Sequence, residues 1–263
     1  MILPTAEIVC LGNELLIGIT INTNASFIGE KLTELGYEVR RVTCIRDEVD
    51  LSVEFFKELF KRKPKLVIVS GGLGPTYDDI QLKVISKSTE LELQENSEAL
   101  EQIKKYYSKR DLKLTKERRK MAFIPEGAKV LDNQVGGAPG CHVVYKEMDI
   151  YCLPGVPTEM KDIFNRHIFP YLRKQNEYQL FQRKFQITGC AESELAPFIN
   201  EVKINFPELY IKSHPEYKGE SGIVIHISGY GESEEKKVVS VMEILQNDFR
   251  RNFPHSEIKA IKE

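Results

Sequence analysis

A regular alternation of short apolar runs with amphipathic segments constrains the fold of this chain more than any other feature. Three apolar runs predict buried strands at residues 7–12, 37–45 and 65–70. Helical spacing of apolar residues predicts helices over 24–35, over 50–60 and directly after residue 79. Successive strand–helix units form a parallel sheet with helices on both faces. We therefore expect an α/β fold, a three-layer α/β/α sandwich with a mostly parallel sheet.

The chain beyond residue 90 predicts further elements and a domain boundary. Residues 94–123 predict helices, two apolar strands follow the glycine loop at 136–140, and a helix follows over 158–171. The segment 171–180 is polar and has no apolar period, so we assign two domains, 1–172 and 173–263. The second is predicted to be a small two-layer α+β domain. Its strand, helix, strand, strand and helix are expected at 185–188, 192–204, 209–213, 222–228 and 233–250.

Charge and composition exclude several classes of protein. The 263 residues carry 37 Lys and Arg against 39 Asp and Glu, a net charge of −2 that argues against a nucleic-acid binder. No apolar run approaches the ~20 residues of a membrane span, and the amino terminus lacks a secretion signal. The five cysteines form no C-x-x-C pair, so no zinc site is evident and a reducing, cytoplasmic location is expected.

The loop Gly71-Gly-Leu-Gly-Pro-Thr-Tyr-Asp-Asp79 carries the most information about function. Glycines directly after a strand let backbone N–H groups approach an anion, and the next helix offers its positive end. Asp78 and Asp79 would repel a bare phosphate, but they fit a Mg²⁺ ion that bridges carboxylates and phosphate oxygens. The structural alternative is that Thr76 caps the helix and Asp79 completes a capping box.

Two further acids follow predicted strands. Glu14 comes after the first strand and Asp47 after the second. The carboxyl ends of parallel strands meet at one edge of a sheet, so Glu14, Asp47 and Asp79 are expected to lie together. Such a group positions a metal and a water for hydrolysis of a phosphoanhydride. Taken alone, Glu14 could be an ordinary surface residue and Asp47 could cap a turn.

Other catalytic and binding patterns are weaker. The Walker, dinucleotide-binding, H-E-x-x-H and G-x-S-x-G motifs are absent, and the five histidines are scattered. Residues 104–120 hold nine Lys and Arg, which form either a solvated helix face or a phosphate-attracting rim over the site. Gly219-Glu-Ser-Gly222 imitates the G-x-x-G clamp of KH domains, but between two strands a hairpin turn is expected instead.

Six motifs taken together resemble the amino-terminal part of the competence/damage-inducible CinA proteins. They are Gly12-Asn-Glu-Leu-Leu16, Asn22-Thr-Asn-Ala25, Arg46-Asp47, Gly71–Asp79, Asn133–Gly140 and Leu153–Met160. They occur in the family's order and cover about residues 5–170. The region is also similar to the molybdopterin-binding fold of the MogA- and MoeA-type proteins. Residues 173–263 resemble the KH-like domain that follows in CinA proteins, and the chain stops before their amidase domain, so amidase activity is not expected.

This resemblance implies a pyrophosphatase that depends on Mg²⁺ or another divalent metal. Its substrate would be ADP-ribose or a related dinucleotide such as FAD, cleaved to AMP and a sugar phosphate. Glu14, Asp47 and Asp79 would handle metal and water, with Asp78 as a fourth metal ligand. The substrate would be bound by Gly71, Gly72, Gly74, Thr76, Asn24, Gly137, Gly140, Gly155 and Glu159. The first motif often has Asp or Thr where this chain has Asn13, so a metal would meet one charge fewer.

Two alternatives stay open. The chain could bind a pterin, or transfer an adenylyl group, in molybdenum-cofactor biosynthesis without hydrolysing dinucleotides, since the Gly71–Asp79 loop suits both chemistries. A nucleic-acid module acting through the basic cluster is the weaker alternative, because both halves of the chain are close to neutral. The family resemblance also implies a homo-oligomer, with a dimer expected.

Overall fold

The computed structural model describes residues 3–176, 178, 180–216 and 222–261. The chain divides into two compact units, Met1–Gln175 and Asn176–Glu263, each with a sheet and a core of its own. None of the helices within the described ranges is long and apolar enough to cross a membrane. Residues 219–221 of the hairpin turn predicted at Gly219–Gly222 lie outside the described residues.

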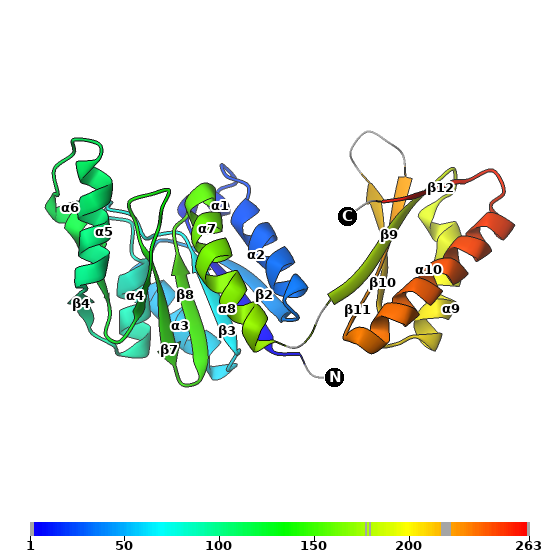
Figure 1. The fold of residues 1–263 in the computed structure, drawn as a ribbon, viewed down its shortest axis with the longest axis horizontal. Helices are drawn as coiled ribbons and strands as arrows, with labels where there is room; N and C mark the ends of the chain where they lie inside the picture. The colour runs from blue at the N-terminus through cyan, green and yellow to red at the C-terminus, as the bar shows by residue number, and fades with distance from the viewer. Residues whose placement is uncertain (1–2, 177, 179, 217–221, 262–263) are drawn as a thin grey trace. The chain divides into compact units, whose positions relative to one another are not determined.

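A six-stranded sheet forms the centre of the first unit (Figure 1). Its strands are β1 (Thr5–Leu11), β2 (Glu38–Ile45), β3 (Leu66–Ser70), β6 (Lys129–Leu131), β7 (Gly140–Tyr145) and β8 (Met148–Leu153). They lie in the order β2-β1-β3-β8-β7-β6. The first four run parallel, and β7 and β6 extend the sheet through antiparallel pairs. The parallel strands therefore all end at the same edge of the sheet.

Helices cover both faces of this sheet. One face packs against α2 (Thr23–Glu34), α7 (Pro157–Ile163), η1 (Phe164–Ile168) and α8 (Phe169–Gln175). The other face packs against α3 (Val49–Lys61), α4 (Gln81–Thr89) and α5 (Ser97–Ser108). Side chains alternate along β1, so Ile8 and Cys10 enter one core while Val9 and Leu11 enter the other. The predicted three-layer α/β/α sandwich with a mostly parallel sheet is confirmed.

Short elements between residues 91 and 131 escaped sequence analysis. β4 (Leu93–Glu95) pairs with β5 (Phe123–Pro125) in a small second sheet, and β6 is equally short. Three residues cannot display a strand period, so the segment 94–123 was expected to be helical throughout. The helices α5 and α6 (Lys116–Lys120) do lie in that segment.

The second unit has two layers. Its antiparallel sheet has the order β10-β11-β9-β12. The strands are β9 (Leu180–Thr188), β10 (Tyr210–Glu216), β11 (Gly222–Tyr230) and β12 (Glu257–Ala260). The helices α9 (Glu192–Asn205) and α10 (Glu232–Asn252) share one core with this sheet. The expected small α+β architecture is confirmed, while its likeness to a KH domain remains a prediction. β12 was not expected, because a charged four-residue edge strand has little apolar pattern.

The edge of the first sheet where the parallel strands begin carries an uncommon backbone conformation. Lys63, Glu90, Lys146 and Glu147 have φ angles of 51°, 62°, 46° and 66°. All four line one broad depression, where β3 begins, α4 ends and β7 turns into β8. A residue with a Cβ atom in this left-handed region loses roughly 1 kcal/mol.

Candidate functional site

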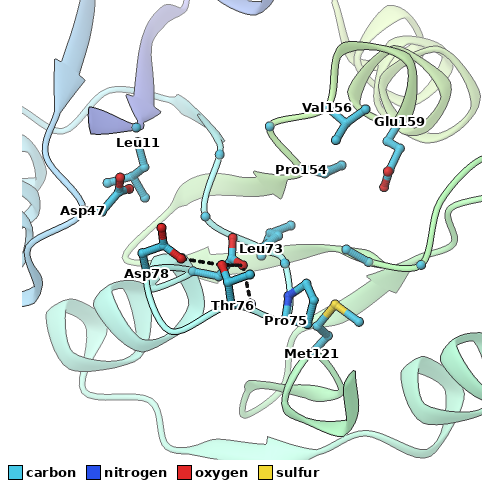
Figure 2. Close-up of a pocket in the computed structure, with 18 of the residues that line it drawn as sticks. Leu11, Asp47, Leu73, Pro75, Thr76, Asp78, Met121, Pro154, Val156 and Glu159 are labelled. Carbon is cyan, nitrogen blue, oxygen red and sulfur yellow. Dashed lines mark hydrogen bonds between the residues drawn. The ribbon is translucent and has the colours of Figure 1, made fainter. Parts of the chain in front are cut away.

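A cleft of about 490 Å³ opens at the carboxyl edge of the parallel strands. The segments that follow β1, β2, β3 and β8 line it (Figure 2), and residues of α5 line it as well. Ligands of open α/β sheets bind at this edge. Eleven of the predicted site residues line the cleft: Glu14, Asp47, Gly71, Gly72, Gly74, Thr76, Asp78, Asp79, Gly137, Gly155 and Glu159.

The loop after β3 turns away from the sheet at Gly71. This residue has a φ of +102°, and a Cβ atom there would lie 2.1 Å from the carbonyl oxygen of Leu11. Only glycine fits this position, because a side chain would collide with the end of β1. The Gly71 N–H donates to Leu153 O at 3.1 Å. It is therefore not free to bind a phosphate, although Gly71 was predicted to bind the substrate.

Three other N–H groups of the loop remain available. Within the described part of the chain, the N–H groups of Gly72, Leu73 and Gly74 donate to no protein atom. Buried Gln81 fixes the loop from behind, because its side-chain amide donates to Gly71 O and Leu153 O at 2.5 and 3.2 Å. A run of unused N–H groups beside a cleft is suited to phosphate oxygens.

The end of the same loop does not form the capping box that was the structural alternative for Thr76 and Asp79. α4 begins at Gln81, two residues beyond Asp79, and no side chain caps it. Asp79 Oδ2 instead accepts from Thr76 N at 2.8 Å and from Thr76 Oγ1 at 2.6 Å. The Thr76 hydroxyl also bonds to Asp78, so its proton is directed to carboxylates rather than to a ligand phosphate. This bond, then a hydrogen bond to the backbone of Asp78 itself and last the charge of Lys120, hold the pKa of Asp78 below its ordinary value.

The expected row of acids is present on the strand ends. Glu14 lies on α1 (Asn13–Leu16), directly after β1. Asp47 follows β2, and its Oδ2 accepts from Asn13 N at 2.9 Å. Burial raises the pKa of Asp47, and the charges of Glu14, Asp78 and Asp79 raise it further. The four carboxylates therefore share one electrostatic environment at this end of the cleft.

These carboxylates do not form a preformed metal cage. Within the described residues, no three His, Cys, Asp or Glu side chains converge closely enough to hold an ion. The oxygen donors nevertheless suit Mg²⁺, which usually keeps several waters and binds through one or two carboxylates plus substrate phosphates. The residues fit an ion that enters together with a phosphorylated ligand. The expected three-carboxylate centre is therefore not assembled in this structure.

The opposite end of the cleft is aromatic. Tyr106 and Tyr107 of α5 line it, with ring centroids 5.2 Å apart. The guanidinium carbon of Arg110 lies 3.7 Å above the Tyr106 ring, and its Nη1 donates to Tyr106 O at 3.1 Å. Arg118 covers the Tyr107 ring in the same way at 4.2 Å. These residues belong to no motif and were not predicted as site residues, although the basic cluster at 104–120 indicated the segment.

Glu159 lies beside this aromatic end. Its Oε2 accepts from Asn133 Nδ2 at 2.6 Å. A Cβ atom on Gly136 would lie 1.9 Å from that oxygen, so only glycine leaves room for the carboxylate. Burial raises the pKa of Glu159, and the Asn133 hydrogen bond only partly offsets it. Asn133 itself is buried and also bonds to Val135 N, Gly136 N and Ala138 O, which fixes the loop between β6 and β7.

Two predicted substrate-binding residues do not line the cleft. Asn24 is buried on α2, and its amide donates to Ser70 Oγ at 2.9 Å and to Gly155 O at 2.8 Å. It therefore ties the end of β3 to the loop after β8. Gly140 begins β7, where a Cβ atom would lie 2.9 Å from Cys152 O. Both residues hold the segments that line the cleft in place, but they do not line it themselves.

Comparison with known proteins agrees with this architecture. A family model described as a probable molybdopterin binding domain matches residues 7–174. A protein of Sulfurisphaera tokodaii is 41% identical over 229 residues, which cover 87% of either chain. A protein of Saccharolobus islandicus is 42% identical over 235 residues, which cover 89% of either chain.

The solved structure of CinA from Thermoplasma acidophilum, described as a protein of unknown function, is 40% identical with a TM-score of 0.58. The match covers 61% of this chain and 94% of CinA, which confirms the predicted resemblance over the first unit. The chain therefore belongs to the family of the probable molybdopterin binding domain, together with CinA.

Proposed function

We propose that the cleft binds a phosphorylated pterin of the molybdopterin type. The observation that carries this proposal is the run of unused N–H groups at Gly72, Leu73 and Gly74, in a domain of a molybdopterin-binding family. The phosphate lies on these N–H groups, and the rest of the ligand extends toward α5. A volume of about 490 Å³ is in the range of small-ligand sites.

A second function, favoured by the carboxylates, is hydrolysis of a dinucleotide such as ADP-ribose or FAD to AMP and a sugar or flavin phosphate. Glu14, Asp47 and Asp79 would hold Mg²⁺ or another divalent ion together with the diphosphate. When bound, such an ion neutralises developing negative charge and activates water. The N–H groups of Gly72, Leu73 and Gly74 would orient the diphosphate, and the Thr76 N–H would fix the Asp79 carboxylate.

One set of measurements separates the two functions. Calorimetry compares neopterin monophosphate with unphosphorylated neopterin, and we expect only the phosphorylated compound to bind tightly. Equal affinity for both compounds would refute phosphate binding by the N–H groups of Gly72, Leu73 and Gly74. Chromatography then follows ADP-ribose and FAD with Mg²⁺ or Mn²⁺, where release of AMP establishes the hydrolase. Pterin phosphate binding without AMP release at micromolar protein leaves pterin binding as the function.

A further inference from the structure

The antiparallel sheet of the second unit is covered by helices on one face. Figure 1 shows α9 and α10 on the same side of this sheet, where they share its apolar core. Successive side chains of a strand point to opposite faces. Within the described residues of the second unit, no third helix is present to cover the other face. We call this other face the open face, and its side chains belong neither to the core nor to the cleft of the first unit.

The centre of the open face holds three adjacent cross-strand rows without a carboxylate. The middle row consists of Lys212, His226 and Lys184, which lie side by side on β10, β11 and β9. The rows on either side begin on β10 with Tyr210 and His214. Among the described residues that the strand register places in these rows, none is Asp or Glu. The open face therefore combines positive charge with aromatic rings.

The rings of the open face lie close together. The His226 ring centroid is 5.4 Å from that of Tyr210 and 6.2 Å from that of His214. Tyr210 is 47% exposed, and His226 Nε2 donates to Gln182 Oε1 at 3.0 Å, which restrains the imidazole. Burial, followed by the charges of Lys184 and His214, lowers the pKa of His226 to about 4. The His226 ring is therefore uncharged at neutral pH, and both rings are suited to stacking on a flat base.

The two lysines of the middle row supply positive charge that no carboxylate offsets. Within the described part of the chain, neither Lys184 nor Lys212 forms an ion pair. Lys259 on β12 differs, because it pairs with Glu257 at 3.2 Å. The net charge of −2 argued against a nucleic-acid binder, but it is a sum over the whole chain and does not describe this face. Unpaired cations beside aromatic rings attract an anion that also carries flat groups.

Single-stranded nucleic acid combines the two features that the open face offers. Its phosphates pair with lysines, and its unpaired bases stack on aromatic side chains. Four-stranded sheets can bind single strands in this way, with two or three bases stacked on the sheet. An acidic peptide would pair with the lysines and leave the rings unused. In a duplex the bases are stacked on one another, so the rings have no access to them.

We propose that the open face binds single-stranded nucleic acid, with bases stacked on Tyr210 and His226 and phosphates on Lys184 and Lys212. The inference goes beyond the proposed function, because it assigns a ligand to the second unit and does not depend on what the cleft binds. Neither kind of contact involves the sugar, so a DNA probe carries all of the required chemistry.

Fluorescence anisotropy of the full chain in about 50 mM NaCl compares three labelled probes. They are a deoxythymidine decamer, the same decamer with an abasic site in place of every base, and a decaglutamate peptide. We expect the intact decamer to bind roughly 10-fold or more tightly than either of the others. Its affinity should fall with salt, with a slope of log K against log salt of about −1.4 for two phosphate contacts. An intact decamer that binds no better than the abasic decamer or decaglutamate, or does not bind, overturns the proposal.

Substitutions on the open face separate stacking from charge. Tyr210→Ala should lower the affinity for the intact decamer about 10-fold and leave the abasic decamer unchanged, whereas Tyr210→Phe keeps the ring and should bind like the unmodified chain. Lys212→Gln should weaken both decamers and make the salt slope shallower by about 0.7. Exposed Lys203 on α9 gives the matched control, since Lys203→Gln should change neither. Thermal melting verifies that each variant is folded, and unchanged binding in folded Tyr210→Ala overturns the proposal.

Two further measurements test whether the nucleic acid binds elsewhere on the chain. Lys113 is an exposed member of the basic cluster at 104–120. Weaker binding in Lys113→Gln together with unchanged binding in Lys212→Gln would overturn the assignment to the open face. An excess of neopterin monophosphate should not displace the decamer, and displacement would place the decamer in the cleft instead. A chain that binds the decamer but not neopterin monophosphate would uphold the open face and refute pterin binding, so the two proposals can fail separately.

Discussion

The two ends of the cleft are built in different ways. The acidic end takes Glu14, Asp47 and Asp79 from the tips of three adjacent strands, and these carboxylates repel one another. The aromatic end is assembled from α5, the loop before β7 and α7, and its carboxylate is held by a buried amide. The acidic end lacks a positive charge that would offset its carboxylates, whereas the hydrogen bonds of the aromatic end are already formed.

This difference teaches which end depends on a ligand for its final geometry. Repelling carboxylates become favourable only when a cation neutralises them, so the acidic end is coupled to what enters the cleft. The aromatic end has paired its groups in advance, and a preorganised site loses less entropy on binding. Substitutions at the two ends should therefore have separable effects.

The largest expected effect comes from Gly71→Ala, which disturbs both ends through the shared loop. The new Cβ atom would meet Leu11 O at 2.1 Å at a φ of +102°, so we expect a loss of about 3 kcal/mol or more in the free energy of unfolding. Gly18→Ala is the control, because Gly18 has a φ of +77° with nothing within 4 Å of its Cβ position. It should cost about 1 kcal/mol in urea unfolding. Equal losses in both variants would refute the close contact.

Asp79→Asn should break the acidic end alone. If the chain hydrolyses ADP-ribose, metal-dependent release of AMP should fall about 100-fold, because the amide keeps the volume and removes the charge. Binding of neopterin monophosphate should stay within about twofold of the unmodified chain. Asp50→Asn is a matched control at an exposed carboxylate that faces Lys87. A lowered melting temperature with unchanged turnover would instead show that Asp79 only stabilises its turn.

Asn133→Ala should break the aromatic end alone. It removes buried hydrogen bonds to the loop before β7 and to Glu159, so we expect a loss of about 2 kcal/mol in stability. Binding of neopterin monophosphate should weaken, because the loop and the Glu159 carboxylate at this end are no longer held in place. Urea unfolding and calorimetry measure the two quantities. A variant that keeps full affinity for neopterin monophosphate would show that ligand binding does not need this amide.

The smallest effect is expected from Glu159→Gln, and it concerns stability against pH. The raised pKa means that the folded chain holds the Glu159 proton more tightly than the unfolded chain, so the charged form is unfavourable at neutral pH. The variant should therefore be slightly more stable than the unmodified chain at pH 7.5. The gain in the free energy of unfolding should be less than about 1 kcal/mol for this half-buried group. The advantage should shrink as the pH falls through the raised pKa toward 4.5. A variant that is less stable at pH 7.5 would contradict the burial effect.

Sequence alone predicted the central sheet, because β1 and β3 are continuous apolar runs and α2 and α3 have clear helical spacing. It also placed Glu14, Asp47 and Asp79 at one edge, since strand-end residues follow directly from a parallel order. The short strands β4, β5 and β6 were missed because tertiary pairing, rather than local pattern, defines them.

The aromatic end could not be predicted for a similar reason. Tyr106 and Tyr107 lie in the stretch of sequence between the motifs that end at Asp79 and begin again at Asn133. Only tertiary packing brings α5 over the cleft. Asn24 and Gly140 lie within motifs, which led us to expect ligand contact where the structure shows a tie between loops and a close strand approach. A motif identifies a neighbourhood, but contact with the ligand depends on which side of the chain faces the cleft.

The left-handed residues at the far edge of the first sheet offer a practical benefit for these experiments. Four residues there have a sterically unfavourable positive φ angle, and none of them lines the cleft: Lys63, Glu90, Lys146 and Glu147. Glycine at these four positions would relieve roughly 1 kcal/mol each, partly offset by a more flexible unfolded chain. A chain stabilised in this way would have a larger free energy of unfolding. Destabilising cleft substitutions such as Gly71→Ala could then be assayed in folded protein.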